Sequence, residues 1–414
     1  MFRRKTILII GVIFSIGFLL STNYLNFELP KGSDRKIVDE IIYEELNKLP
    51  KFYKLSPKNA NVEVEGFFKN LSTSAKYPYK NLRHLWQTAN SWTNKDRLVD
   101  IRSPYLNDVV TSMKYAKITG ADLDHRGTQL KLILTLEGNQ QVIFKPKWYD
   151  IRKVLEGPVY VGKDRFNSEI IAFYLSLMLK KPLCPVSTTR EISLQNDILP
   201  VASKRLLETV LVRNNRTCVY GKCFFCNRND PICDNENARL EGAVIFNFKA
   251  NLVNHRSPWQ RTYKKDKNAL WQEYTETYCD VIKAKLSKRR LYDLVEVSIF
   301  DFLMQNGDRH HYETIEDNVL WLDNGKGLGN PYKHHLDILA PLYQCCMLRK
   351  TMYDNLLKLR GGGLLELLNG IPDVERLITN EHLKAIDERL LLVFATIEYC
   401  KKGNGDSVFD TILQ

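Results

Sequence analysis

The sequence contains no internal repeat, no low-complexity stretch longer than Gly361-Gly362-Gly363, and only one run of residues apolar enough to cross a bilayer. The lack of repeats excludes a fibrous protein, and the lack of further apolar runs excludes a polytopic membrane protein. Disorder over most of the chain is excluded too, because 44% of the 414 residues are hydrophobic and 26% are charged. A chain of this length suits one large two-lobed domain or about two to three smaller ones.

Acidic residues are too few to balance the basic ones, since 48 Asp and Glu face 60 Lys and Arg and leave a net charge of +12. A basic chain can serve nucleic acid, an anionic substrate or the phosphates of a nucleotide. The charge alone does not choose between these partners, so the cellular compartment has to be read from other features.

The N-terminus has the pattern of a segment that enters the secretory pathway. Arg3, Arg4 and Lys5 precede an uncharged run of 22 residues, Thr6–Phe27. As a helix rising ~1.5 Å per residue it would reach ~33 Å and span a hydrocarbon core of ~30 Å. The basic flank favours a cytoplasmic N-terminus and a lumenal remainder. The alternative is a cleaved signal peptide, which the lack of a clear small-residue cleavage site after Leu20 disfavours.

Two N-glycosylation sequons, at Asn70 and Asn215, agree with a lumenal chain. Each triplet alone is a weak signal, because such triplets also arise by chance. Together with the N-terminal pattern, they argue against a nuclear or cytosolic protein, and we therefore expect no nucleic-acid partner.

After the predicted anchor at 1–27, the sequence divides into three regions. Residues 28–64 predict a stem with a short helix, residues 65–402 are globular, and residues 403–414 form a C-terminal tail. Within the globular part, a β-rich region to about 245 precedes a helix-rich region from about 246. The periodicity predicts strands at 129–136, 141–145, 243–248 and 318–322, and helices at 166–179, with Asp164 as a candidate N-cap, and at 291–304.

Nine cysteines are many for a cytosolic protein but ordinary for a secretory one. Four of them lie within sixteen residues and fit either an all-cysteine zinc site or two disulfides, and an oxidising lumen favours the disulfides: Cys218, Cys223, Cys226 and Cys233. Adjacent Cys345 and Cys346 cannot easily pair with each other, so we expect them to staple the helical region through different partners, where Cys279 and Cys400 also lie. Cys184, in an apolar context, is expected to be buried and free.

Four charged elements follow one another in the order of a protein kinase. Lys145 ends a hairpin strand, Glu169 lies on the following helix, Asp308 follows an apolar helix, and Asp323-Asn324-Gly325 follows a short strand. A lysine can hold nucleotide phosphates, and carboxylates can hold a divalent metal that bridges them. A further carboxylate can orient the acceptor hydroxyl or take its proton. Lys145, Asp323 and Asp308 are predicted to fill these three roles.

The pattern also departs from that of a standard protein kinase. No G-x-G-x-x-G loop precedes Lys145, and the position five residues after Asp308 is Glu313 rather than the usual metal-binding Asn. Taken singly, each charged residue is more often a solvated charge, and an Asp-Asn-Gly triplet is most often a turn. The order of all four elements supports the kinase interpretation, but of an atypical kind.

Three stretches at 127–133, 144–146 and 306–313, the last reading NGDRHHYE, resemble the atypical secretory-pathway kinases, the family of the Golgi casein kinase. The resemblance covers roughly residues 65 to 402. It implies an α+β, kinase-like fold with a β-rich N-lobe and a helical C-lobe, stapled by disulfides. Further stretches look closer to the glycosaminoglycan xylosylkinases of this family: 145–150, 220–223, 255–259 and 338–346.

This resemblance implies an activity. The chain would transfer the γ-phosphate of ATP, with Mn²⁺ or Mg²⁺, to the 2-hydroxyl of xylose in the Gal-Xyl linkage region of proteoglycans. It would do so as a single-pass type II protein of the Golgi membrane with a lumenal catalytic domain. The alternatives are a lumenal Ser protein kinase acting on secreted proteins and a pseudokinase that activates a partner, and both a homo-oligomer and a hetero-oligomer stay open.

The resemblance also implies roles for individual residues. Asp308 would be catalytic, and Glu169 would serve the metal with Asp323 rather than only pair with Lys145. The nucleotide would be contacted by Gln129, Lys131, Lys145, Glu313 and Asp323, and by the hinge strand Ala243, Val244, Ile245 and Phe246. The implied disulfides are Cys218–Cys233, Cys223–Cys226, Cys279–Cys345 and Cys346–Cys400. For the sugar, Trp259, Trp271 and Tyr263 are candidates, although each is by default a packing residue.

Overall fold

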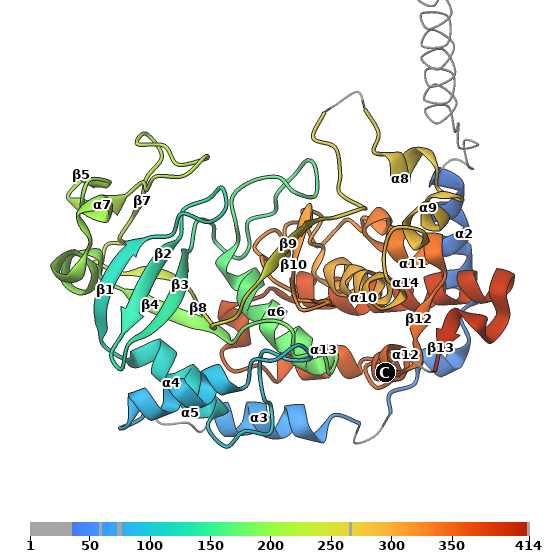
Figure 1. Cartoon of the computed structure of the whole chain (residues 1–414), viewed down its shortest axis with the longest axis horizontal. Coiled ribbons are helices and arrows are strands. Elements are labelled where there is room, and N and C mark those ends of the chain that lie inside the picture. Colours follow the sequence, from blue (N-terminus) through green and yellow to red (C-terminus); the bar gives the residue numbers. More distant parts are fainter. Residues whose placement is uncertain (1–34, 58–59, 73–76, 265–266, 412–414) are drawn as a thin grey trace, which may run out of the picture.

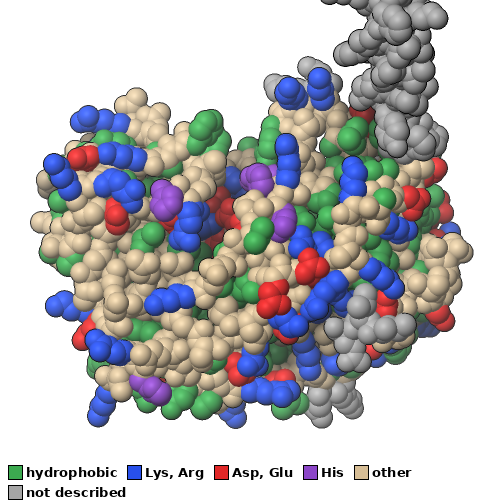
Figure 2. Space-filling model, viewed as in Figure 1, with side chains coloured by type: hydrophobic (Ala, Val, Ile, Leu, Met, Phe, Trp, Pro, Cys, Tyr) green, Lys and Arg blue, Asp and Glu red, His purple; other side chains and the backbone are tan. Residues whose placement is uncertain are grey.

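The computed structural model describes residues 35–57, 60–72, 77–264 and 267–411. A sheet-rich lobe lies beside a lobe made mostly of helices (Figure 1). The space-filling view shows the same face hollowed between the two lobes, with acidic side chains set back in the hollow (Figure 2). The anchor predicted at 1–27 lies outside the described residues. Within the described part of the chain, none of the helices is both long and apolar enough to cross a bilayer.

The N-lobe is built on a five-stranded antiparallel sheet in the order β1-β2-β3-β8-β4. The predicted hairpin is present, because Gly138 (φ 83°) and Asn139 (φ 66°) take the left-handed conformation that a tight β2–β3 turn needs. Strand β8, which lies between β3 and β4, overlaps the predicted 243–248 but begins and ends earlier. The strands are β1 (Ile118–Leu123), β2 (Leu132–Leu136), β3 (Gln140–Pro146), β4 (Ser187–Ile192) and β8 (Leu240–Phe246).

Helix α6 (Phe166–Met178) joins the sheet to the C-lobe, and every one of its residues is buried. It contacts β4 and β8 on one side and α10 and α13 on the other. The predicted helix at 166–179 is thus confirmed, but its predicted N-cap is wrong. Arg165 occupies the cap position and makes no capping bond from its side chain, while the Asp164 carboxylate lies instead beside Lys145.

The C-lobe is organised around α10 (Lys288–Met304). Ser287 is the N-cap of this helix, and its hydroxyl accepts a hydrogen bond from the Arg290 amide. Nearly all of α10 is buried, which places the apolar residues that predicted it in the core. The predicted strand at 318–322 is shorter than expected, since β11 covers only Asn318–Val319. The Leu320 amide still donates to the Glu313 carbonyl of β10, but the Trp321 amide donates to the Leu183 carbonyl instead. The other main C-lobe elements are β9 (Val253–Arg256), β10 (His311–Ile315), α9 (Tyr278–Lys283), α11 (Ala340–Cys345), α12 (Lys350–Leu357), α13 (Gly363–Asn369) and α14 (Asn380–Asn404).

The described part of the predicted stem, 28–64, belongs to the C-lobe. Helix α2 (Arg35–Lys48) packs on α14, and Ile42 on it is fully buried. Tyr53 stacks on Phe394 with ring centroids 4.5 Å apart, and its hydroxyl donates to Glu398 at 2.6 Å. The prediction of a separate stem is therefore wrong for these residues, because an apolar stripe on α2 faces the core rather than solvent.

Three further helices precede β1, namely α3 (Val62–Ser72), α4 (Leu82–Ser91) and α5 (Leu106–Tyr115). The predicted C-terminal tail, 403–414, is also partly ordered. Helix α14 continues to Asn404, Val408 is buried, and β13 (Phe409–Asp410) pairs in parallel with β12 (Leu348–Arg349). The C-lobe thus extends beyond the predicted boundary at 402.

Four disulfides are present, in the pairs that the family resemblance implies. Cys218–Cys233 joins β6 (Arg216–Val219) to β7 (Ile232–Cys233), next to β5 (Val210–Arg213) in a small N-lobe sheet. Cys279–Cys345 and Cys346–Cys400 join α9, α11 and α14. Cys184 is buried and free. The alternative zinc site would need four thiolates that these bonds consume.

Candidate active site

Lys145 is the centre of an ionic cluster at the cleft, in which Lys145 and Glu169 are buried and Asp323 is exposed. Its Nζ lies 2.6 Å from Glu169 Oε1, 2.8 Å from Asp323 Oδ1 and 3.1 Å from Asp164 Oδ2. Burial opposes the charge of this lysine, which is 4% exposed, but the three carboxylates outweigh burial and raise its pKa well above the ordinary value. In turn, the Lys145 ammonium lowers the pKa of Asp323. Three residues predicted from different parts of the sequence thus converge on one point.

Each member of the cluster comes from a different element. Lys145 lies on β3, Glu169 in the first turn of α6, and Asp323 on the loop after β11. Asp323 has φ 55°, and the next amide, of Asn324, donates to Glu169 Oε1 at 3.0 Å. A Cβ on Gly325 would come within 2.6 Å of the Asp164 carboxyl carbon, so only glycine lets this loop approach the cluster.

Asp308 lies on a loop that the end of α10 delivers into the cleft. Gln305 ends this helix in the left-handed conformation, at φ 58°. Arg309 then fastens the loop, because its Nη2 donates to Asp301 Oδ1 at 2.7 Å and to Asn324 Oδ1 at 2.9 Å. The catalytic candidate and the Asp323 loop are therefore held by one buried guanidinium.

The surroundings of Asp308 differ from those of Lys145. Burial raises the pKa of Asp308, and its Oδ1 accepts a 2.6 Å hydrogen bond from the hydroxyl of Tyr263. Lys326, whose pKa is lowered by burial, lies 3.6 Å from Asp164 and its charge acts on Asp308. A carboxylate that is costly to ionise and within reach of a hydroxyl has the properties of a general base.

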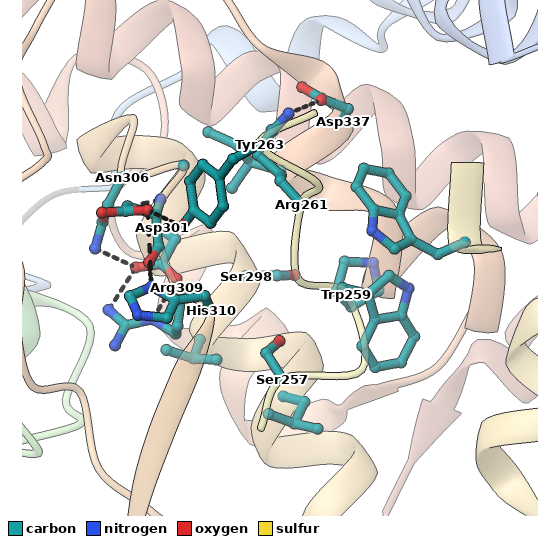
Figure 3. A pocket seen from close by; sticks show the side chains of 17 residues that line it. Ser257, Trp259, Arg261, Tyr263, Ser298, Asp301, Asn306, Arg309, His310 and Asp337 are labelled. Atoms are coloured by element: carbon teal, nitrogen blue, oxygen red, sulfur yellow. Dashed lines mark hydrogen bonds and ion pairs between the residues drawn. The ribbon is translucent and has the colours of Figure 1, made fainter. Parts of the chain in front are cut away.

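A pocket of about 50 Å³ opens beside Asp308 (Figure 3). Trp259 and Trp271 line it but are only 9% and 2% exposed, and their indole N–H groups donate to Gln344 and to the Gln260 carbonyl. Tyr263 is 55% exposed, and in Figure 3 its ring lies beside Asn306 and the Asp301–Arg309 pair. Of the three aromatic sugar candidates, Tyr263 alone presents a large exposed face.

The predicted nucleotide residues lie around the same cleft. Gln129 Oε1 accepts from the Asp164 amide at 2.8 Å. The positive charge of Lys131 acts on both Asp323 and Glu313, and burial raises the pKa of Glu313. In the sheet, Ala243 pairs with Lys145, so the predicted hinge strand Ala243–Phe246 lies directly beside β3.

Two residues of the site were missed as functional groups by the sequence reasoning. Asp164 precedes a helix, and this position indicates a cap rather than a partner for a lysine 19 residues earlier. Lys326 follows an Asp-Asn-Gly turn, where a lysine is usually solvated. The side chains of Asp164 and Lys326 both reach the cleft because residues 162–165 lie over the Asp323 loop in the folded chain.

The sequence of residues 84–408 matches the protein family described as Golgi casein kinase, C-terminal, Fam20. The chain belongs to the Fam20 family. This Fam20 chain is 37% identical to a glycosaminoglycan xylosylkinase homolog of Drosophila melanogaster over 99% of its own length and 100% of the relative. It is 39% identical to the glycosaminoglycan xylosylkinase of Homo sapiens over 87% of its own length and 91% of the relative.

Two solved Fam20 structures share the fold. The structure of hydra Fam20 with sugar has a TM-score of 0.75 and 37% identity, and covers 80% of this chain and 99% of that one. The Golgi casein kinase with Mn/ADP bound has a TM-score of 0.72 and 22% identity, covering 93% of this chain and 94% of that one. The predicted family and the predicted two-lobed kinase-like fold are confirmed.

Proposed function

We propose that this Fam20 chain is an ATP-dependent xylosylkinase that phosphorylates the 2-hydroxyl of xylose in the proteoglycan linkage region. The observation that carries the kinase activity is the convergence of Glu169 and Asp323 on Lys145, with Asp308 across the cleft. The substrate class is supported by the identity to relatives named glycosaminoglycan xylosylkinase, which extends over nearly the whole chain.

The carboxylates of the cleft fit a divalent metal held together with a nucleotide. Oxygen ligands suit Mn²⁺ and Mg²⁺, and such metals are commonly bound by one or two carboxylates plus substrate phosphates. Within the described residues, no group of three or more His, Cys, Asp or Glu side chains is arranged to hold a metal by itself. We assign Glu169 and Asp323 to the metal, in keeping with the Mn/ADP bound to the Golgi casein kinase. When bound, the metal would neutralise phosphate charge.

The remaining residues have roles that follow from their charges. Lys145 would hold the phosphates of ATP, with Lys131 beside it, while Gln129, Glu313 and the strand Ala243–Phe246 would line the nucleotide. Asp308 would accept a hydrogen bond from the xylose hydroxyl and receive its proton as the phosphoryl group is transferred. Arg309 would keep Asp308 and the Asp323 loop in register.

We further propose a lumenal position in the Golgi, with residues 1–27 as a type II membrane anchor. The four disulfides suit an oxidising compartment. Asn215 is exposed on the turn between β5 and β6, and Asn70 is exposed on α3, so both sequons are accessible to glycosylation.

The substrate is tested by incubating the lumenal part of the chain with ATP and Mn²⁺ and either a Gal-Xyl disaccharide or casein. We expect phosphate on the xylose of the disaccharide and none on casein. Phosphate on casein alone would instead identify a Ser protein kinase. Nucleotide binding without any transfer would identify a pseudokinase.

A further inference from the structure

The hydroxyl of Tyr263 stands where an acceptor hydroxyl has to stand. It donates to Asp308 Oδ1 at 2.6 Å. A carboxylate that orients a hydroxyl for phosphoryl transfer must be within about 2.6–3.2 Å of that hydroxyl. The phenol of Tyr263 and the hydroxyl of a sugar would therefore compete for the same oxygen of Asp308.

The position of Tyr263 is supported by a strap, residues 157–163, that crosses the catalytic loop. The ring of Tyr160 on this strap packs edge-on against Tyr263, with centroids 4.9 Å apart. Val159 fills the space that a side chain at Gly307 would need. Lys326 donates to the Gly162 carbonyl and so ties the strap to the Asp323 loop.

On the side away from Tyr160, Tyr263 is loosely packed, so its side chain can move. The residue is 55% exposed and is one of the residues that line the pocket in Figure 3, and its second ring contact, with His310, is looser, with centroids 6.4 Å apart. Burial and the bond to Asp308 raise the pKa of Tyr263, so the phenol keeps its proton and stays a donor. A ligand that binds the pocket by several contacts can displace it, whereas a single water molecule gains little by doing so.

We propose that Tyr263 is an acceptor gate, which occupies the catalytic oxygen of Asp308 in the sugar-free enzyme and is displaced by the sugar hydroxyl. The gate protects ATP, because water at Asp308 would be an alternative acceptor and would release the γ-phosphate as inorganic phosphate. In that side reaction the P–O bond to ADP breaks, a P–O bond to water forms, and the water proton passes to Asp308. This inference rests on the proposed function.

The first test is ATP hydrolysis by Tyr263→Phe with Mn²⁺ and no sugar. The variant keeps the edge-on ring contact with Tyr160 but loses the donor to Asp308. We expect hydrolysis to rise at least ~5-fold, because a hydrogen bond to a charged group is lost. With Gal-Xyl we expect a lower KM and a kcat within about twofold of wild type. The matched control is Tyr332→Phe, since Tyr332 is 70% exposed and its hydroxyl has no partner among the described residues.

A second readout needs neither ATP nor metal. In protein with ¹³C-labelled tyrosine rings, the Tyr263 signal is identified by its loss in Tyr263→Phe. We expect Gal-Xyl to move this signal toward that of solvent-exposed Tyr332 and to leave Tyr332 unchanged. The gate is wrong if Gal-Xyl leaves the Tyr263 signal in place although the wild-type enzyme phosphorylates Gal-Xyl. It is also wrong if Tyr263→Phe and Tyr332→Phe hydrolyse ATP at the same rate in the absence of sugar.

The two hypotheses fail in different ways. If Gal-Xyl receives no phosphate but Tyr263→Phe hydrolyses ATP faster than wild type, the proposed substrate is wrong and the gate stands. If wild type and Tyr263→Phe phosphorylate Gal-Xyl equally well and hydrolyse ATP at the same rate, the proposed function stands and the gate is wrong.

Discussion

On the nucleotide side of the cleft, Lys145 has three carboxylate oxygens within 3.1 Å and is almost inaccessible to solvent. On the acceptor side, the carboxylate of Asp308 accepts a 2.6 Å hydrogen bond from the hydroxyl of the half-exposed Tyr263. The first arrangement fixes charges that must meet the same nucleotide in every turnover. The second keeps one carboxylate available to ligands that come and go.

Among the substitutions that test this difference between the two sides of the cleft, Asp308→Asn should have the largest effect. The amide retains the volume and can still accept from Tyr263, so folding should be intact. Transfer to the sugar should fall by about 10²–10⁴-fold, because the proton acceptor is gone. The assay is phosphate transfer to Gal-Xyl, with thermal unfolding as the check on folding. Asp150→Asn, at an exposed position, is the control, and full activity in Asp308→Asn would contradict the assignment.

The nucleotide side should respond in stability as well as in activity. Lys145→Met leaves Asp164, Glu169 and Asp323 without their shared cation, and we expect a loss of about 3 kcal/mol in the free energy of unfolding together with most of the activity. Urea unfolding measures the first quantity. Adding Glu169→Gln should restore part of the stability but none of the activity.

The matched control for Lys145→Met is Lys147→Met, because Lys147 is the next lysine along the chain and makes a single, part-exposed ion pair with Glu241 at 2.8 Å. Such a pair contributes at most about 1 kcal/mol. Equal destabilisation by both substitutions would mean that the cluster around Lys145 contributes no more to stability than a surface ion pair.

The two sides of the cleft should also differ in their dependence on pH. Burial raises the pKa of Asp308, so kcat/KM should fall about tenfold per pH unit once the pH drops below that raised value. The pKa of Asp323 is lowered by Lys145, so its contribution to stability is present above the ordinary value of ~3.9 and is lost only below it. A plot of kcat/KM and of Tm against pH should show activity failing first on acidification. Simultaneous loss of both would contradict the contrast.

The sequence predicts some residues of the cleft and not others, for a physical reason. Lys145, Glu169, Asp308 and Asp323 were found because each follows or occupies a regular element whose periodicity is visible along the chain. Asp164 and Lys326 were not, because loops 162–165 and 323–327 meet only in three dimensions. A loop-to-loop contact leaves no period in the sequence.

The lack of a local signal for contacts between distant segments also explains which boundaries of elements and regions could be predicted. The strands β2 and β3 and the helices α6 and α10 were predicted within a few residues, since their burial patterns repeat locally. For residues 28–64 the sequence predicts a stem, because their apolar residues are sparse. What makes their described part belong to the C-lobe is α14, more than 300 residues away, against which Ile42 and Tyr53 are buried. Packing between distant segments overrides local composition here.

The smallest expected effect concerns the excess charge outside the cleft. Figure 2 shows Lys and Arg side chains scattered over this face with acidic ones among them, rather than gathered in one field. Scattered charges steer a ligand weakly, and salt screens them beyond about 10 Å. We expect kcat/KM for an anionic proteoglycan substrate to fall less than about threefold between ~50 and ~300 mM salt, and that for neutral Gal-Xyl to stay constant. A tenfold fall would mean that the net charge of +12 guides substrates to the cleft after all.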